Sequence, residues 1–364
     1  MRLLFAESSV RGYGTEQHIA ALATAMARRG HDVRCLVIAG SPVATLLHEA
    51  QVPMVSIRPG PTRGMRIAAA LLRLAVRQRP DWMVSNDPRF YRMLLAVRRL
   101  TGSRVALFRH WHDAPAKPRS RDLLSRRSDR FILVSRFHRE DYQRQGMSVE
   151  RASVLYNPID TGRFRPSPAA RLSARVRLGL ADSHLVVGYV GRMIAGKGIF
   201  TLADAAERFL PADASAHMLW VGDGADCAAL RARIEQSAHA SRHRFLGWEG
   251  DPAALYPALD VLAVPSIYPE PFGRVSVEAQ AAAVPVISSL VGGLPETFVA
   301  DSTGIGVAPG DADALASAVL ALMGDPERRR RMGAAGRDWV SGRFSLERIG
   351  EDFECLLAGA TPRR

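Results

Sequence analysis

Cysteine is scarce in this sequence, with three residues at positions 35, 227 and 355 of a 364-residue chain. Their odd number and wide spacing exclude a disulfide framework and a cysteine-based zinc cluster. No apolar run reaches the length of about 18 residues that a membrane-spanning helix needs. The N-terminus enters a short apolar strand and lacks the long hydrophobic region of a signal peptide. These absences predict a cytoplasmic protein.

Aromatic residues are also few, at 7% of the chain, and no motif offers a platform on which bases could stack. A nucleic-acid partner is therefore not expected. Hydrophobic residues make up 47% and charged residues 23%, which is typical of a globular protein with a substantial core. At roughly 100–200 residues per domain, the length predicts two domains.

Lysine is almost missing, because the 49 basic residues comprise 47 arginines and two lysines. The net charge of +13 is also uneven: residues 1–165 carry +16 and residues 166–364 carry −3. Compositional drift towards arginine explains the first fact but does not segregate charge by domain. The alternative is that the basic half meets an anionic membrane or an acidic acceptor.

Short apolar runs alternate with amphipathic helical patterns through most of the chain. Strands are predicted at 3–6, 33–38, 81–85, 105–108, 130–135, 185–190, 218–221, 244–246, 261–264 and 284–287, and helices at 16–29, 66–79, 315–323 and 345–357. Strand–helix alternation favours parallel sheets covered by helices on both faces. The predicted fold class is therefore α/β, with two Rossmann-like, doubly wound parallel-sheet domains that face a cleft.

The alternation lapses between about residues 160 and 181, where Phe164-Arg-Pro-Ser-Pro is typical of a linker. We therefore predict a basic N-terminal domain at 1–165 and a second Rossmann-like domain at 166–345. A final helix at 346–364 is expected to pack back on the N-terminal domain. Ligands of open α/β sheets bind at the carboxyl ends of the strands, and most motifs described next follow a predicted strand.

Two glycine-containing loops could receive phosphate. The first, Arg11-Gly-Tyr-Gly-Thr-Glu, includes Gly14 and precedes a helix, although a plain tight turn explains it equally well. The second begins at Gly191 and carries Arg192 and Lys197, two cations beside a helix start, which suits a diphosphate. Lys197 is the sole lysine of residues 166–364. A solvated surface pair is the alternative.

Two carboxylates, Glu270 and Glu278, lie in the stretch that starts at Pro265. A loop-borne Glu270 and a helix-borne Glu278 can face one pocket and accept hydrogen bonds from sugar hydroxyls, including a vicinal ribose diol. Gly273 lets the backbone approach a phosphate or sugar. The competing view makes Glu278 a structural acid at a helix start.

Other polar clusters carry weaker signals. Arg109, His110 and His112 follow a predicted strand of the basic half; the two histidines lack a third metal ligand, and surface or packing roles compete with a place in the cleft. Asp311-Ala-Asp313 precedes a helix, which favours N-capping over metal binding. Residues 292–296 are expected to form a turn that feeds a helix. No required metal is predicted.

Taken in order, these motifs resemble those of the retaining glycosyltransferases of family 4, which have the GT-B architecture. The resemblance covers nearly the whole chain and is strongest from Leu185 to Thr297. The matching elements are the paired glutamates Glu270 and Glu278, Val190-Gly-Arg192 with Lys197-Gly, Gly222-Asp-Gly, Gly292-Gly-Leu-Pro-Glu296, and Asn157-Pro-Ile-Asp with Phe164.

The family implies a role for each position. Glu278 would hold the ribose hydroxyls, while Glu270 with the backbone of Pro271, Phe272 and Gly273 would hold the donor sugar. Arg192 and Lys197 would neutralise the leaving diphosphate, and Gly14, Gly191 and Gly222 would line the donor site. His110 would act beside the sugar and acceptor. Arg109 and His112 would belong to the acceptor side.

The sequence departs from the family pattern at two places. The double glycine of the first loop is Gly12-Tyr-Gly14, which weakens the expected phosphate contact there. Gln280 and Ala283 replace the usual Met and Gly after the second glutamate, a change expected to alter packing more than chemistry.

The sequence therefore predicts a retaining hexosyltransferase that moves a sugar from a nucleotide-diphosphate sugar to a glycan or lipid-linked acceptor. Bacterial cell-envelope polysaccharide or lipopolysaccharide synthesis is the expected setting, without a cofactor or required metal. Peripheral contact with the inner face of the cytoplasmic membrane, through residues 66–79 and 117–130, is compatible with this activity. The alternatives are a nucleotide-sugar epimerase of the same fold and a basic membrane-binding protein without catalysis.

Overall fold

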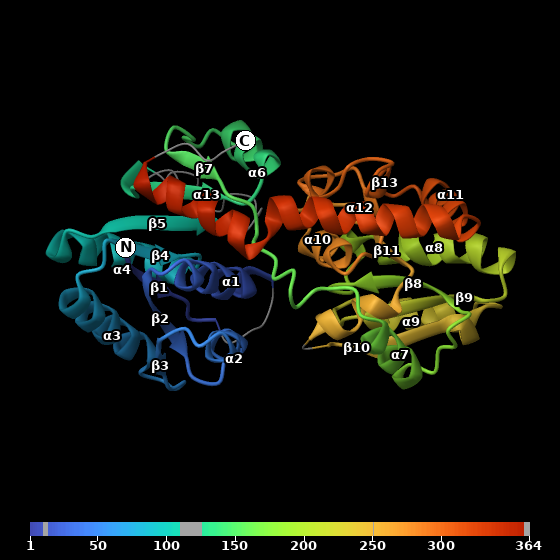
Figure 1. Cartoon of the computed structure of the whole chain (residues 1–364), viewed down its shortest axis with the longest axis horizontal. Helices are drawn as coiled ribbons and strands as arrows, with labels where there is room; N and C mark the ends of the chain where they lie inside the picture. Colours follow the sequence, from blue (N-terminus) through green and yellow to red (C-terminus); the bar gives the residue numbers. More distant parts are fainter. Residues whose placement is uncertain (10–13, 110–125, 250, 360–364) are drawn as a thin grey trace. The chain divides into compact units, whose positions relative to one another are not determined.

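The structure is a computed structural model that describes residues 1–9, 14–109, 126–249 and 251–359. The chain divides into two compact units (Figure 1). The N-terminal unit comprises Met1–Pro158 and Phe344–Arg364, and the C-terminal unit comprises Ile159–Arg343. Each unit contains one parallel sheet with helices packed on it, as the strand–helix alternation predicts.

The N-terminal unit contains a seven-stranded sheet in the order β3-β2-β1-β4-β5-β6-β7. Its strands are β1 (Arg2–Ala6), β2 (Asp32–Ile38), β3 (Met54–Ile57), β4 (Trp82–Ser85), β5 (Arg104–Arg109), β6 (Arg130–Leu133) and β7 (Ala152–Val154). Its helices are α1 (Gly14–Arg28), α2 (Pro42–Glu49), α3 (Arg63–Gln78), α4 (Pro88–Thr101), α6 (Arg136–Arg144) and α13 (Leu346–Ala358). All the neighbouring strands run parallel.

Alternating side chains of this sheet feed two separate cores. Leu3 and Phe5 of β1 pack with helices α1, α2 and α13 on one face, whereas Leu4 and Ala6 pack with α3 and α4 on the other. This period of two is what a strand covered on both faces requires. The C-terminal helix α13 joins the first core through Phe353, whose ring lies 6.5 Å from that of Phe5.

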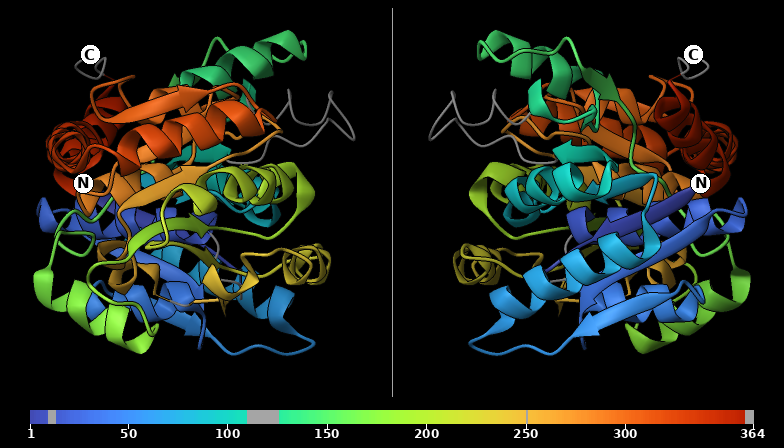
Figure 2. Two further views of the ribbon diagram at one scale, coloured as in Figure 1. Left: turned by 90° about the vertical axis from the view of Figure 1, so that its right-hand side faces the viewer. Right: turned by 90° about the vertical axis from the view of Figure 1, so that its left-hand side faces the viewer.

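The C-terminal unit contains a six-stranded parallel sheet in the order β10-β9-β8-β11-β12-β13. Its strands are β8 (Leu185–Val190), β9 (Ala216–Val221), β10 (His243–Gly247), β11 (Val261–Val264), β12 (Val286–Ser289) and β13 (Gly304–Val307). Its helices are α7 (Pro168–Arg177), α8 (Ile199–Phe209), α9 (Cys227–Glu235), α10 (Arg274–Ala281), α11 (Ala312–Met323) and α12 (Pro326–Phe344), which ends one residue inside the N-terminal unit. The strands of both sheets can be followed by colour in Figure 2.

In both sheets the strand order reverses at one point. The chain winds outward from β1 towards β3 and then returns to place β4 on the other side of β1; β8 and β11 meet in the same way in the second sheet. A reversal of this kind leaves a crevice at the carboxyl ends of the two central strands, which is where doubly wound sheets bind ligands. A ligand site is therefore expected at the carboxyl ends of β8 and β11.

The structure confirms the predicted N-cap at Asp311, whose carboxylate accepts a hydrogen bond from the backbone N–H of Ala314 at 2.8 Å. The helix expected after residues 292–296 is wrong, because Leu294–Thr297 forms only a single 3₁₀ turn and the next element is strand β13. Strands β3, β7 and β13 are additions to the predicted set. Each is only three or four residues long and partly exposed, so none produces a strong apolar run.

Candidate active site

The predicted donor motifs lie at the reversal point of the second sheet. Gly191 and Arg192 follow β8, and a 3₁₀ turn, η1 (Ala195–Lys197), leads into α8. Glu270 lies in the loop after β11, and Glu278 lies on α10, which that loop feeds. Because β8 and β11 are neighbours, the fold brings two motifs that are distant in the sequence to one edge of one sheet.

Lys197 and Glu270 form an ion pair, with 2.6 Å between Nζ and Oε2. Glu270 is 7% exposed as a residue, and its carboxylate also accepts a hydrogen bond from the Ser266 hydroxyl. Lys197 lies over the ring of Tyr268, with Nζ 5.5 Å from the ring centroid. A buried carboxylate needs partners of this kind, because burial without them strongly disfavours its charge.

The two loops that carry this pair are held together through glycine. The carbonyl of Gly196 accepts hydrogen bonds from the backbone N–H groups of Ile267 and Tyr268, at 2.9 and 3.2 Å. Gly198 has a φ of +72°, and a Cβ there would lie 1.8 Å from the carbonyl oxygen of Pro265. Glycine is therefore required for the close approach of the two backbones.

A second glycine contact supports Glu270 from the other side. The backbone N–H of Gly293 donates to the carbonyl of Glu270 at 2.7 Å. Gly292 has a φ of +64°, and a Cβ on it would approach the Glu270 backbone nitrogen to 2.4 Å. The two glycines of the Gly292–Glu296 motif thus pack against the Glu270 loop, which gives that motif a physical role beside the site.

Glu278 is 3% exposed and has a partner on each oxygen. The Tyr256 hydroxyl donates to Oε2 at 2.9 Å, and Nε of Arg274, one helical turn earlier, donates to Oε1 at 2.6 Å. The opposite charge of Arg274 and these two hydrogen bonds stabilise a carboxylate in a largely dry environment. Glu278 lies beyond the first turn of α10. The alternative hypothesis that it is a structural acid at the start of a helix is therefore wrong.

The remaining predicted donor-side residues of the C-terminal unit follow strands β8 and β9 of the same sheet or lie in the loop after Glu270. Arg192 is exposed, and its carbonyl accepts a hydrogen bond from the Tyr189 hydroxyl at 2.7 Å. Gly191 and Gly222 directly follow the neighbouring strands β8 and β9, and a Cβ on Gly222 would lie 1.9 Å from the Gly191 carbonyl oxygen. This spacing leaves no room for any side chain at position 222.

Pro271, Phe272 and Gly273 connect Glu270 to α10. Phe272 is buried at 2% exposure and anchors the loop. Gly273 precedes the helix with a φ of +107°, a conformation that side chains disfavour. The loop therefore presents its backbone at the start of α10, where N–H groups and the helix dipole favour an anion.

The predicted residues of the N-terminal unit are only partly within the described chain. Gly14 is the first residue of α1 and the first described residue after position 9. Arg109 ends β5 and is 9% exposed, and its Nε has no hydrogen-bond partner among the described residues. His110 and His112 lie outside the described residues, so their predicted roles stay predictions.

The sequence reasoning did not single out Tyr256, Ser266 and Arg274, which contact the two glutamates directly. Arg274 had a detectable signal, because it lies four residues before Glu278 on a helix, the spacing at which an ion pair forms. Ser266 lies four residues before Glu270 in the same loop, but no spacing rule for loops marks such a contact, and Tyr256 reaches Glu278 from 22 residues away only through the fold. Among the described residues, no cluster of three or more His, Cys, Asp or Glu side chains suits a metal ion.

Comparison with solved structures identifies the fold. HepE from Anabaena, in complex with UDP and glucose, superposes with a TM-score of 0.85 and 24% identity, over 98% of this chain and 99% of that one. WaaG, a glycosyltransferase involved in lipopolysaccharide biosynthesis, gives a TM-score of 0.71 at 17% identity, over 98% and 100%. The two parallel-sheet units are those of the GT-B glycosyltransferases.

Sequence comparison then defines the family. Residues 13–163 match the family model described as Glycosyltransferase Family 4, and residues 171–339 match Glycosyl transferases group 1. The GDP-mannose-dependent alpha-(1-6)-phosphatidylinositol monomannoside mannosyltransferase of Mycobacterium tuberculosis is 32% identical over 324 residues, 84% of this chain and 82% of the relative. The chain belongs to glycosyltransferase family 4 and is a glycosyltransferase.

A second relative is the alpha-maltose-1-phosphate synthase of Mycolicibacterium smegmatis, 34% identical over 62% of this chain and 61% of the relative. The names of these two relatives describe different reactions, so the family alone does not define a donor or an acceptor. Within the described part of the chain, every helix is too short or too polar to cross a membrane.

Proposed function

We propose that this glycosyltransferase moves a hexose, with retention of its anomeric configuration, from a nucleotide-diphosphate sugar to a glycan or lipid-linked acceptor of the bacterial cell envelope. The observation that carries the proposal is the Lys197–Glu270 ion pair at the reversal point of the second sheet. It sets a cation suited to a diphosphate beside a buried carboxylate suited to sugar hydroxyls.

The proposed chemistry breaks the bond between C1 of the sugar and the diphosphate oxygen. A bond from the acceptor oxygen to C1 forms on the same face, and the acceptor proton passes to the departing diphosphate. Negative charge grows on the diphosphate as the bond breaks. Lys197, Arg192 and the N-terminus of α10 stabilise that charge more in the transition state than in the ground state, which accelerates the reaction.

Glu270 holds the transferred sugar and Glu278 the ribose in this proposal. Both carboxylates keep acceptor capacity, because each carboxylate offers about four lone-pair positions and each uses two in the structure. Arg109 and His112 are assigned to the acceptor side, and His110 to a catalytic place beside the sugar and acceptor. The envelope setting is supported by the named substrate of the mycobacterial relative, a phosphatidylinositol mannoside, and by the involvement of WaaG in lipopolysaccharide biosynthesis.

The test begins with thermal unfolding of the protein in the presence of UDP, GDP and ADP, since a ligand bound to the native state raises apparent stability. The nucleotide that stabilises then selects the sugar donors for a transfer assay with membrane lipid extracts as acceptors. Transfer with net retention supports the proposal. Turnover that releases nucleotide and a modified free sugar without any acceptor would instead identify an epimerase.

Helix α3 supports a membrane location for the acceptor step. Its inner stripe, Ile67, Leu71 and Ala75, is buried. A second apolar stripe runs along the outer face at the same helical spacing, formed by the exposed residues Met65, Ala69, Leu72 and Val76. Exposed apolar residues at this spacing beside arginines are typical of a helix that lies in a membrane interface.

The arginines beside this outer stripe form no ion pair with a carboxylate of the described residues. Among the described residues, Arg66, Arg73 and Arg77 have no carboxylate within 4.0 Å. Helix α7 offers a contrast in the C-terminal unit: its exposed Leu172 and Val176 lie beside arginines that form ion pairs with Asp260 and Glu249. We propose that the outer face of α3 binds anionic lipid.

The two helices provide a matched test. Leu72→Ser with Val76→Ser should reduce sedimentation with vesicles that contain phosphatidylglycerol, whereas Leu172→Ser with Val176→Ser should not. Vesicles of phosphatidylcholine alone should bind neither the wild type nor the variants. Binding that ignores lipid charge, or equal losses in both variants, would contradict the assignment to α3.

A further inference from the structure

Tyr256 is fully buried in a 3₁₀ turn, η5 (Tyr256–Ala258), and its hydroxyl donates to Oε2 of Glu278 at 2.9 Å. Arg274 donates to the other oxygen at 2.6 Å. Burial and then the charge of Glu278 raise the pKa of Tyr256 well above its usual value, so the hydroxyl keeps its proton and remains a donor. The Glu278 carboxylate is thus held at both oxygens from two different elements.

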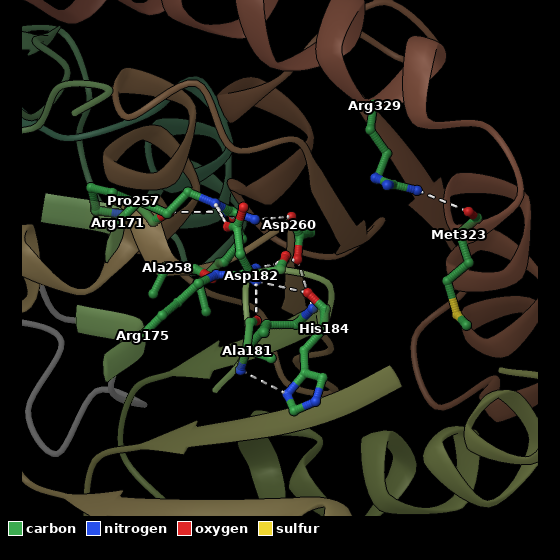
Figure 3. Close-up of polar contacts among 12 residues, drawn as sticks. Arg171, Arg175, Ala181, Asp182, His184, Pro257, Ala258, Asp260, Met323 and Arg329 are labelled. Carbon is green, nitrogen blue, oxygen red and sulfur yellow. Dashed lines mark hydrogen bonds and ion pairs between the residues drawn. The ribbon is translucent and has the colours of Figure 1, made fainter. Parts of the chain in front are cut away.

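The segment that carries Tyr256 is fixed by arginines of α7 (Figure 3). Nε of Arg175 donates to the Ala258 carbonyl at 3.1 Å, and Arg171 donates to the Pro257 carbonyl at 3.1 Å. Arg175 is itself 1% exposed and donates to Asp260 at 2.7 Å. These hydrogen bonds fix the backbone of the η5 turn and so restrict the position from which the Tyr256 side chain extends.

A second contact fixes the ring of Tyr256. Phe164 packs edge-on against it, with 5.8 Å between ring centroids. Phe164 is the last residue of the Asn157–Phe164 motif, and its carbonyl accepts a hydrogen bond from Arg337, which also donates to Ala281 at the end of α10. Phe164 therefore contacts the ring of Tyr256 directly, and Arg337 links Phe164 to the C-terminal end of α10, the helix that carries Glu278.

We propose that Tyr256 and Arg274 are positioning residues that orient the Glu278 carboxylate so that its two remaining acceptor positions meet the vicinal hydroxyls of a ribose. The inference rests on the proposed function, because it takes Glu278 as the ribose-binding group. It adds a specificity: the enzyme should discriminate ribonucleotide donors from deoxyribonucleotide donors through two residues that do not themselves touch the nucleotide.

Orientation matters here because a carboxylate accepts well only near its lone-pair directions. If either donor is removed, the carboxylate can rotate towards the remaining partner, and the geometry for a diol is lost. The loss should affect only ligands that carry the diol. A purely structural defect would instead weaken binding of ribose and deoxyribose nucleotides alike.

The experiment measures dissociation constants of GDP, UDP and ADP and of their 2′,3′-dideoxy forms by calorimetry. For the nucleotide that binds best, the wild type should prefer the ribose form by about a hundredfold, since two hydrogen bonds to a charged group are at stake. Tyr256→Phe and Arg274→Met should each reduce that ratio about tenfold, with little change in the affinity of the dideoxy form.

The matched control is Tyr189→Phe. Tyr189 is also a buried tyrosine of the same unit, but its hydroxyl donates to the Arg192 carbonyl at 2.7 Å on the phosphate side. This variant should keep the ribose-to-dideoxy ratio of the wild type. In a Glu278→Gln background, Tyr256→Phe should no longer change the ratio, because the group it orients has lost its charge.

The outcomes separate the two proposals. If no nucleotide binds to the wild type, the proposed function fails. If the wild type binds nucleotides but does not prefer ribose, or if both variants keep the ratio while Glu278→Gln lowers it, the positioning role is overturned and the donor site stands. Arg274→Met keeps the test valid if Tyr256→Phe does not fold.

Discussion

Nζ of Lys197 lies 2.6 Å from Oε2 of Glu270, between loops that follow the two central strands of the second sheet. The cation expected to meet the leaving diphosphate is thus balanced by the carboxylate expected to meet the sugar. A bound donor would bring its own negative charge to Lys197 and its hydroxyls to Glu270. The pair is therefore preorganised around the bond that the proposed reaction breaks.

The first prediction concerns Lys197→Ala. Turnover in a donor-consumption assay should fall about 10²–10³-fold, by analogy with the loss of one preorganised donor to a developing negative charge. The control is Arg208→Ala, which removes a surface ion pair with Asp313 in the same unit and should leave turnover near normal. Near-normal turnover of a folded Lys197→Ala protein would remove Lys197 from the mechanism.

The second prediction concerns Gly198→Ala. Its Cβ would lie 1.8 Å from the Pro265 carbonyl oxygen, so the two loops must separate, and the free energy of unfolding should fall by about 3 kcal/mol or more. Gly310→Ala is the control: its φ is +80°, but nothing lies within 4 Å of the added Cβ, and only about 1 kcal/mol should be lost. Equal losses in urea titrations would show that the backbone conformation, not the close approach, requires glycine.

The strands of the two sheets differ in how far they can be predicted from the sequence. The long buried strands, such as 33–38 and 185–190, follow from their apolar runs, and the reversal points follow from strand–helix alternation only once the strand order is known. Strand β13 (Gly304–Val307) contains two glycines and lacks the β-branched run that would have indicated it. Short edge strands of this kind are formed by pairing with their neighbours.

The candidate site was accessible from the sequence through its charged residues and the glycine motifs beside them. Lys197 and Glu270 each stood out by composition or motif, but the 2.6 Å contact between them depends on β8 and β11 being neighbours. Tyr256 belongs to none of the sequence motifs, and its bond to Glu278 is a tertiary contact across 22 residues. Residues that orient the charged groups of a site are thus harder to predict from the sequence than the charged groups themselves.

The third prediction concerns Arg175→Met. The Arg175 guanidinium is 1% exposed and donates to Asp260 and to the carbonyls of Ala181, Asp182, His184 and Ala258 (Figure 3). Its removal takes one of its donors from Asp260, which keeps Arg171, and leaves several buried carbonyls without their arginine donor, so the free energy of unfolding should fall by about 3–5 kcal/mol.

Arg171→Met is the matched control for Arg175. Arg171 also bonds to Asp260, at 2.9 Å, but its side chain is 30% exposed, so water can replace it and a loss of about 1 kcal/mol is expected. Chemical denaturation of both variants makes the comparison. A small loss for Arg175→Met would mean that the surrounding carbonyls find water, and that α7 does not fix the η5 turn as argued.

The fourth prediction is a pH dependence from His243. Burial lowers the pKa of this histidine from 6.5 to about 4, and Nε1 of Trp220 donates to its Nδ1 at 3.1 Å. Between these two pH values the unfolded chain binds a proton that the folded protein does not, so stability is complete above pH 6.5 and decreases as the pH falls towards 4. The total contribution is about 3 kcal/mol.

His243→Asn should flatten that part of the stability profile, because asparagine does not titrate and its side-chain oxygen can still accept from Trp220. Urea unfolding at a series of pH values between 4 and 7 makes the comparison. His48→Asn is the control, since His48 is exposed on α2 and should leave the slope of the profile as it is. A slope unchanged by His243→Asn would show that other groups cause the loss of stability in acid.

The near-absence of lysine has a consequence for covalent chemistry. With two lysines in 364 residues, an amine-directed reagent meets one side chain at the centre of the proposed donor site, one at position 117, and the terminal amine. The Lys197 side chain is 18% exposed, enough for contact with a small electrophile. Occupancy of the site could therefore be followed by mass spectrometry as protection of a single peptide, without knowledge of the acceptor.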